Sequence, residues 1–176
     1  MFHRSERLFL RPAFPEDWQA IHARVSDEGV VRNLARAPWP YGEADARFFA
    51  SMKQDMRLPH FLVTLPGEGV IGSAGLGEHE GEPEIGYWIG RDYWGHGFAT
   101  EAGRAVVDIA RVLGHRRLKA GHFADNTASG KVLRKIGFRP TGQIRKRYSL
   151  ARGSEVASVE FELDLDGPAM ELPRAA

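Results

Sequence analysis

The feature that most constrains this 176-residue chain is a glycine turn between an apolar strand and a helix. Residues 87–102 read YWIGRDYWGHGFATEA, so a predicted strand runs into Gly95-His96-Gly97 and a helix-forming sequence follows at once. The N–H groups in the first turn of a helix have no partners inside the helix, and the helix dipole favours anions at that end. We therefore expect this turn to bind phosphate oxygens of a ligand.

The composition restricts the class of protein. The chain has 24 basic and 23 acidic residues and a net charge of +1, so its charge gives no reason to expect nucleic acid or a membrane surface as a partner. It has no cysteine, which excludes disulfides, thiolate metal sites and a cysteine nucleophile. No membrane-spanning run or signal peptide is recognisable. We expect a cytoplasmic protein with a single domain over residues 1–166 and a loose tail over 167–176.

The pattern of apolar residues predicts a mixed α/β fold. Turn-rich connections separate three consecutive strands, as in hairpins, and the last strand alternates apolar and polar residues. The expected strands lie at 7–11, 60–65, 70–77, 84–90, 117–124, 142–150 and 156–165, and the expected helices at 15–26, 43–56, 98–113 and 126–136. This order predicts a mixed, mostly antiparallel sheet of about seven strands flanked by about four helices.

The glycine turn has three possible interpretations when it is taken alone. A dinucleotide-binding fingerprint would need glycine or alanine at the sixth position, where this chain has Thr100, and it would lie in a first βαβ unit. A Walker loop is excluded, because Asp125 stands where glycine is required and Val132 follows Lys131. A tight turn that needs glycine only for its backbone remains open.

A second motif, DNTASGKVLRKIGF over residues 125–138, follows the next predicted strand. Asn126 is placed to cap a helix, and Ser129 lies one turn later on the same side. Together, the two motifs resemble the GCN5-related N-acetyltransferase (GNAT) superfamily, whose glycine loop reads Gln/Arg-x-x-Gly-x-Gly/Ala. They resemble most closely its RimJ/RimL-like ribosomal-protein N-terminal acetyltransferase branch. The resemblance covers roughly residues 5–165, and Asp92 is a departure from the broad motif.

The resemblance implies that the chain uses acetyl-CoA and no metal. The pyrophosphate would bind the N–H groups of residues 95–100, and the strand before the loop would splay from its neighbour so that pantetheine pairs with its edge. The cofactor-binding residues expected on this basis are Trp88, Ile89, Gly90, Trp94, Gly95, His96, Gly97, Phe98, Ala99, Thr100, Asn126 and Ser129.

The resemblance further implies direct transfer of the acetyl group to a primary amine through a tetrahedral intermediate. The acceptor would be a protein N-terminus or a small-molecule amine, and a homodimer is compatible with the family. The N–H near Ile89 would stabilise the oxyanion. We expect Glu84 to act as the base, directly or at the end of a water chain that could instead reach His79 or Glu160.

Ser129 is the expected acid, with Tyr148 second. By its spacing from Ser129, Tyr148 occupies the position where some members of the branch carry the base, although a phenol of pKa ~10 is a poor base near neutrality. Two alternatives in other classes remain. One is a GNAT-fold module that binds acyl-CoA without transferase activity, and the other is a nucleotide-binding oxidoreductase of Rossmann type.

Overall fold

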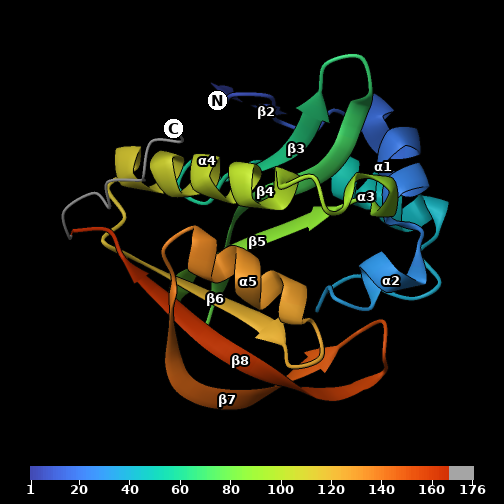
Figure 1. Ribbon diagram of the computed structural model, residues 1–176. Coiled ribbons are helices and arrows are strands. Elements are labelled where there is room, and N and C mark those ends of the chain that lie inside the picture. The colour runs from blue at the N-terminus through green and yellow to red at the C-terminus, as the bar shows by residue number, and fades with distance from the viewer. Residues whose placement is uncertain (167–176) are drawn as a thin grey trace.

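The computed structural model describes residues 1–166, and the predicted tail at 167–176 lies outside the described residues. Eight strands form one sheet in the order β1-β2-β3-β4-β5-β6-β8-β7 (Figure 1). All neighbouring strands are antiparallel except β5 and β6. The strands are β1 His3–Arg4, β2 Phe9–Arg11, β3 His60–Leu65, β4 Gly69–His79, β5 Glu82–Ile89, β6 Arg117–Phe123, β7 Arg139–Ser149 and β8 Ser154–Asp164.

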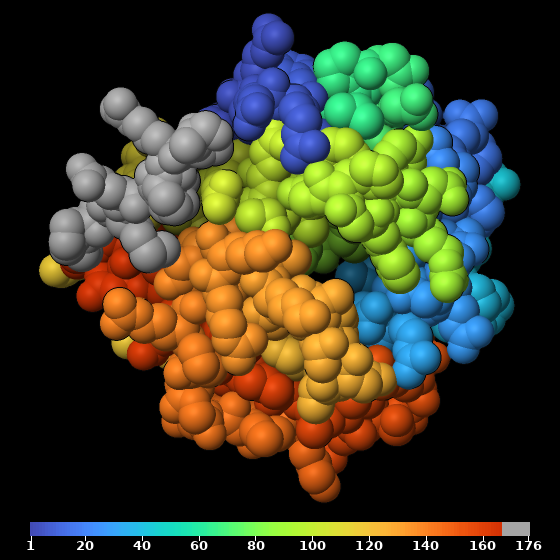
Figure 2. All heavy atoms as spheres, viewed as in Figure 1, coloured from blue at the N-terminus to red at the C-terminus, as the bar shows by residue number. Residues whose placement is uncertain are grey.

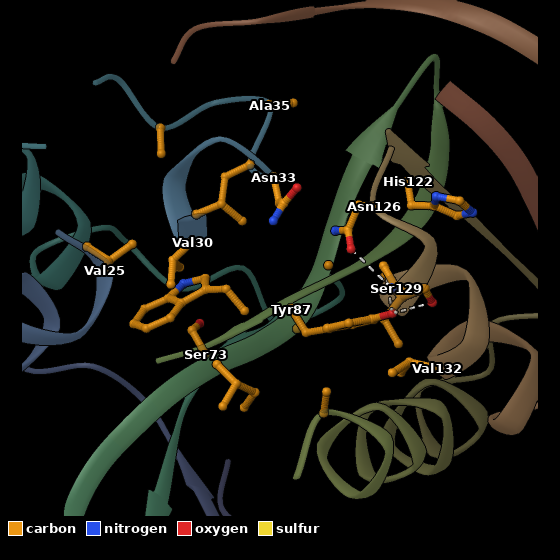
Figure 3. A pocket seen from close by; sticks show the side chains of 18 of the residues that line it. Val25, Val30, Asn33, Ala35, Ser73, Tyr87, His122, Asn126, Ser129 and Val132 are labelled. Carbon is orange, nitrogen blue, oxygen red and sulfur yellow. Dashed lines mark hydrogen bonds between the residues drawn. The ribbon is translucent and has the colours of Figure 1, made fainter. Parts of the chain in front are cut away.

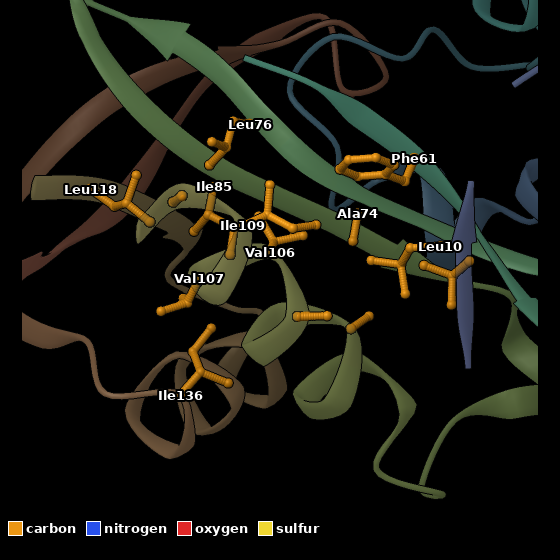
Figure 4. Packing of buried hydrophobic residues seen from close by; sticks show 14 of the residues in the cluster. Leu10, Phe61, Ala74, Leu76, Ile85, Val106, Val107, Ile109, Leu118 and Ile136 are labelled. Carbon is orange, nitrogen blue, oxygen red and sulfur yellow. The ribbon is translucent and has the colours of Figure 1, made fainter. Parts of the chain in front are cut away.

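Helices cover both faces of the sheet, and each face has its own hydrophobic core. The helices of the described part are α1 Trp18–Val25, α2 Glu28–Val31, α3 Glu43–Ala50, α4 Phe98–Val112 and α5 Thr127–Lys135, with short 3₁₀ turns at Pro15–Asp17 and Arg91–Tyr93. The larger core joins α4 and α5 to the sheet; Figure 4 shows Val106 and Ile109 of α4 directed at Ile85 and Leu76. The smaller core joins α1, α2 and α3 to Leu62 and Val70 on the other face.

The predicted mixed, mostly antiparallel fold is confirmed, with eight strands and five helices in the described residues. The helix expected over 43–56 is wrong at its end, since α3 stops at Ala50. Beyond it, the Asp55 carboxylate accepts the N–H groups of Arg57 (2.7 Å) and Leu58 (3.2 Å). Such side-chain bonds to the local backbone compete with helix hydrogen bonds. The sequence also gave no sign of α2 or β1, which have only four and two residues.

The sheet opens between β5 and β6, its one parallel pair. Eight residue pairs join β4 to β5, whereas β5 and β6 share only the pair of Glu84 and Lys119. Beyond Glu84 the two strands diverge, as Figure 1 shows, and α5 lies beside the opening. The predicted splay of the strand that precedes the glycine loop is therefore confirmed. It leaves one edge of β5, from Ile85 to Ile89, without a neighbouring strand.

Candidate active site

A cleft of about 1120 Å³ occupies the opening between β5 and β6. Its walls come from the glycine loop and the start of α4, from α5, from β4 and β5, and from the segment between α1 and α3. Figure 2 shows the surface hollowed where the yellow-green atoms of the glycine loop region meet the orange atoms of α5 and the blue atoms of the α2 region. In the close-up of Figure 3, Val30 and Asn33 face Asn126 and Ser129 across the cavity, with Tyr87 between them.

The glycine loop leaves the N-terminus of α4 open to a ligand. Gly95 and Gly97 have φ angles of 81° and 80°, which L-residues with a Cβ rarely adopt. Gly97 is the N-cap of this 15-residue helix, and no side chain caps it. The acid of the first turn, Glu101, is bound elsewhere, because its carboxylate accepts hydrogen bonds from Ser5 Oγ and from the Arg7 backbone, both at 2.7 Å. The open first turn fits an anion such as a pyrophosphate.

Local contacts hold this loop in shape. The indole Nε1 of Trp94 donates to the carbonyl of Ile89 at 2.6 Å, which fastens the loop to the end of β5. The ring of His96 stacks on Phe98 with centroids 5.8 Å apart and hydrogen-bonds the Trp94 carbonyl through Nδ1 (2.8 Å). Trp94, Gly95 and Gly97 line the cleft together with residues 98–100, whereas the ring of His96 stays outside it. His96 is thus a packing residue, and only its backbone belongs to the loop.

Arg7 brings a cation to the same loop. Its Nε pairs with Glu101 at 2.7 Å, its NH1 donates to the His96 carbonyl at 3.1 Å, and its guanidinium lies 4.6 Å from the ring centre of Phe98. Its side chain is 45% exposed, so part of the guanidinium remains accessible next to the open helix end. Sequence reasoning treated the strand near Arg7 only as part of the fold.

The free edge of β5 presents alternate backbone groups to the cleft. The N–H of Gly90 donates to the Ile71 carbonyl at 2.8 Å, and the carbonyl of Gly90 accepts the N–H of Tyr93 at 3.0 Å. Because antiparallel pairs alternate, the backbone groups of Ile89 point the opposite way, toward the opening, where its carbonyl accepts the indole N–H of Trp94. The backbone groups of Trp88, which pairs with Ser73, point to β4, so the expected backbone contact at Trp88 is corrected. The expected backbone contact at Gly90 is therefore corrected, since both of its groups are used inside the protein and Gly90 does not line the cleft.

Ser129 and Asn126 meet a residue that the motifs did not reveal. Asn126 caps α5 by accepting the N–H of Ser129 on its Oδ1 (3.2 Å). The hydroxyl of Ser129 lies 2.9 Å from the hydroxyl of Tyr87, which reaches from β5 across the opening (Figure 3). Burial raises the pKa of Tyr87 to about 12, despite the hydrogen bond from Ser129 that opposes this shift. Tyr87 thus stays protonated near neutral pH and holds Ser129 at the cleft.

Glu84 lines the cleft as part of a partly buried ionic cluster. Arg147 of β7 pairs with Glu84 at 2.6 Å through NH1 and with Glu160 of β8 at 2.5 Å through NH2. The three side chains are only 12–18% exposed. Arg147 reaches β5 because Gly121 of β6 lies beneath it, and a Cβ at Gly121 would come within 2.9 Å of the guanidinium. Burial lowers the pKa of Arg147, but the hydrogen bonds and charges of the two carboxylates raise it overall.

Tyr148 does not lie where the sequence placed it. Its side chain is 56% exposed and is not part of the cleft wall, because neighbouring residues of a strand point to opposite faces and Arg147 takes the inward position. His79 also lies outside the cleft wall. The two cations that precede Arg147 in the sequence are surface residues, Arg145 pairing with Glu80 and Lys146 with Glu155.

Segments far apart in the sequence close the cleft on the side of α2. Asp125 accepts bonds from both guanidinium nitrogens of Arg152 (2.9 and 3.0 Å) and from Arg32 (3.0 Å). The N–H of Leu150 donates to the Ala35 carbonyl at 3.0 Å. The hydrogen bond from Arg152 lowers the pKa of Asp125, although partial burial opposes this. These contacts tie the α2 region and the β7–β8 hairpin to the start of α5.

The comparisons with known proteins agree with this geometry. Residues 7–139 match the family model of the acetyltransferase (GNAT) domain. The uncharacterized N-acetyltransferase p20 of Bacillus licheniformis is 30% identical over 168 residues, covering 90% of this chain and 93% of that protein. The chain belongs to the GNAT acetyltransferase family. The predicted family is thus confirmed, the chain is an acetyltransferase, and a Rossmann-type oxidoreductase is excluded.

Solved structures of GNAT proteins share the fold. The GNAT acetyltransferase from Bacillus anthracis superimposes with a TM-score of 0.81 at 26% identity, covering 95% of this chain and all of that one. RimL, a ribosomal L7/L12 α-N-protein acetyltransferase solved with coenzyme A, gives a TM-score of 0.79 at 21% identity, covering 94% and 99%. These likenesses show that the chain shares the fold of these proteins.

Two further properties concern residues 1–166. No three His, Asp or Glu side chains in this part of the chain are grouped closely enough to hold a metal ion. None of its helices has the length and apolarity needed to cross a membrane.

Proposed function

We propose that this GNAT protein transfers the acetyl group of acetyl-CoA directly to a primary amine of a protein N-terminus or a small molecule. The observation that supports the proposal is that three features suited to binding acetyl-CoA lie in one cleft. These are the uncapped N-terminus of α4, the unpaired edge of β5, and the Ser129–Tyr87 pair. A phosphate-bearing thioester of extended shape needs an anion site, a backbone edge and a hydroxyl near its sulfur, in that order.

The residues of the glycine loop and α5 would hold acetyl-CoA, which supplies the activated acyl group. The N–H groups at the start of α4 would bind the pyrophosphate, assisted by the charge of Arg7. The unpaired edge of β5 would pair with the amide chain, and the N–H of Ile89 would donate to a developing oxyanion. Ser129 would donate a proton or a hydrogen bond to the departing sulfur, with Tyr87 fixing its hydroxyl.

The acceptor side would handle the proton of the amine. The cluster of Glu84, Arg147 and Glu160 carries two carboxylates against one guanidinium, so it has one negative charge in excess. That charge would attract an ammonium ion, and Glu84 would take its proton directly or through water. We do not retain Tyr148 as the acid, since it is exposed outside the cleft.

The test is release of CoA thiol from acetyl-CoA on a panel of N-terminal peptides and small amines, with the acetylated product identified by mass spectrometry. Ser129→Ala should lower kcat and leave CoA binding close to that of the parent. The alternative of a binding module without turnover predicts CoA binding but no product on any amine. That result, with an intact fold and measurable CoA binding, would overturn the proposal.

A further inference from the structure

We infer that the acceptor site is a trough floored by strand glycines, and that it takes a primary amine with an apolar, flat or unbranched body. The inference rests on the proposed function, because it names the acceptor class of the same cleft. Its starting point is the pair Gly77 and Gly86, which lie in β4 and β5 and both line the cleft. A Cβ built at either position would meet no atom within 4 Å.

Other strand glycines in the same region have a reason within the protein. A Cβ at Gly72 would come 2.3 Å from the Trp88 carbonyl, and one at Gly75 would come 2.4 Å from the Cα of His60. These two glycines are needed for the chain to pack against itself. Packing of the chain does not require glycine at positions 77 and 86, although glycine weakens the interior of a strand. The space that they leave lies in the cleft, so it is available to a molecule other than the chain itself.

The register of β4 and β5 places Trp88 at one end of the trough and Glu84 at the other. Ser73 pairs with Trp88, Gly75 with Gly86, and Gly77 with Glu84, and these alternate positions share one face of the sheet. Gly86 therefore lies between Trp88 and Glu84, whose positions are about 13 Å apart at ~3.3 Å per residue. A phenyl or an unbranched alkyl group fits along a floor of that length.

The trough faces away from the expected acetyl-CoA site. Tyr87, which lies between Gly86 and Trp88, points to the opposite face and reaches Ser129 in α5. Glycine at position 86 therefore makes room on the side of α1 and α3, where an acceptor would approach the unpaired edge of β5. Substitutions in the floor can thus disturb the acceptor without touching the glycine loop.

The chemistry of the walls sets the class of amine. One end holds Glu84, whose cluster with Arg147 and Glu160 carries one excess negative charge suited to an ammonium ion. Beside Gly75, the ring of His60 lies against Phe49 with centroids 5.6 Å apart, and both rings line the cleft.

The remaining wall of this side is largely apolar and includes Trp88, Met52 and Pro38. Asp45 at the start of α3 also lines this side, where its carboxylate accepts the N–H of Gly42 at 2.8 Å. A second ammonium group, as in a polyamine, would be desolvated without a partner where it lies against the apolar part of this wall. The walls therefore favour an amine with one charged end and an apolar body.

The test adds bulk to the floor. Gly77→Leu and Gly86→Leu should each lower kcat/KM for 2-phenylethylamine and hexylamine by roughly tenfold or more, through KM, because the side chain fills the trough. Gly86→Ala should have a smaller effect in the same direction. Ala157→Leu is the control, since it adds all but one of the same carbons at an exposed position of β8 outside the cleft wall. All variants should keep the CoA-dependent rise in melting temperature of the parent.

A panel on the parent identifies the source of the amine. Spermidine should be a poorer substrate than hexylamine by roughly tenfold, and peptides that begin with Phe should outperform peptides that begin with Asp if the source is an N-terminus. Preference for spermidine, or unchanged turnover of the apolar amines by both leucine variants, would overturn the inference.

Calorimetric binding of 2-phenylethylamine to the CoA-bound protein separates this inference from the proposed function. Binding to the parent that is lost in Gly86→Leu supports the trough even if no acetylated product forms, and in that case only the transferase proposal fails. If the parent binds no apolar amine, or if both leucine variants bind it as well as the parent does, the trough is not the acceptor site.

Discussion

The two halves of the cleft differ in the groups that form them: backbone groups in one half and side chains in the other. The half near α4 and α5 consists of two short segments of chain, and much of its chemistry lies in backbone groups held by Gly95, Gly97 and the Asn126 cap. The acceptor half is assembled from side chains of β4, β5, β7, β8 and the α2 region, and its charged residues come from three different strands. A site formed by backbone groups of contiguous residues can be recognised as a sequence motif. A site formed by side chains that strand register brings together from distant positions cannot.

The largest effect is expected from Gly97→Glu, which tests the backbone half. The substitution places bulk and a negative charge at the open helix end, and CoA affinity should fall by about 100-fold or more, equivalent to roughly 3 kcal/mol. Titration calorimetry with CoA measures the loss. Gly114→Glu is the control, because Gly114 has a similar φ of 77° at the far end of α4. If both variants bind CoA like the parent, the loop is not the anion site.

Arg147→Gln tests the side-chain half through stability. It leaves the partly buried Glu84 and Glu160 without their partner, and the loss of unfolding free energy should approach the ~3–5 kcal/mol of a fully buried pair. Urea denaturation followed by circular dichroism gives the value. Arg145→Gln removes an exposed pair with Glu80 and should cost under about 1 kcal/mol. Equal losses in the two variants would mean that the cluster is not a buried unit.

Ser129→Ala and Tyr87→Phe test the contact where the two halves meet. Each should lower kcat by roughly 10- to 100-fold, because positioned proton donors contribute on that scale. The double variant should be little worse than either single variant, since the two hydroxyls act as one hydrogen-bonded pair. CoA affinity should stay near that of the parent. Additive losses in kcat would contradict a shared role.

The smallest effect concerns the pH dependence of stability in the acceptor wall. Burial lowers the pKa of His60, so the folded protein disfavours the imidazolium form. The resulting stability is present above pH ~6.5 and is lost as the pH falls below that value toward the folded pKa. Urea midpoints at pH 7.5 and 5.5 should differ less in His60→Gln than in the parent. His96→Gln, at an exposed ring, should keep the parent's difference; an identical slope in all three proteins would contradict the assignment.

Much of the fold was predictable because its elements carry strong local patterns. The strand at 60–65 was placed at its observed bounds, and the helix expected at 98–113 differs from α4 by one residue. The family followed from two motifs that lie on contiguous chain. The end of α3 at Ala50 was not predictable from apolar spacing, and beyond it Asp55 binds the N–H groups of Arg57 and Leu58 instead of continuing the helix.

The candidate site divides in the same way. Gly97, Ser129 and Asn126 lie in the cleft or cap its helix, as their spacing suggested. The roles of Tyr87 and Arg147 were missed, because their partners are 42 and 63 residues away in the sequence. The sequence could not decide whether Arg147 or Tyr148 points into the cleft. That depends on which face of β7 is turned inward, and a shift of one residue exchanges the two faces.

The sequence by itself determined the glycine loop, the cap of α5 and the family, because backbone conformation and helix capping depend on residues close in the chain. Only the tertiary structure decided where along β5 the predicted splay begins, that one guanidinium binds two carboxylates, and that a Cβ at Gly77 or Gly86 would meet no other atom of the protein within 4 Å. The physical reason is that strand register and helix packing bring distant side chains together, and no short segment of sequence encodes their distance.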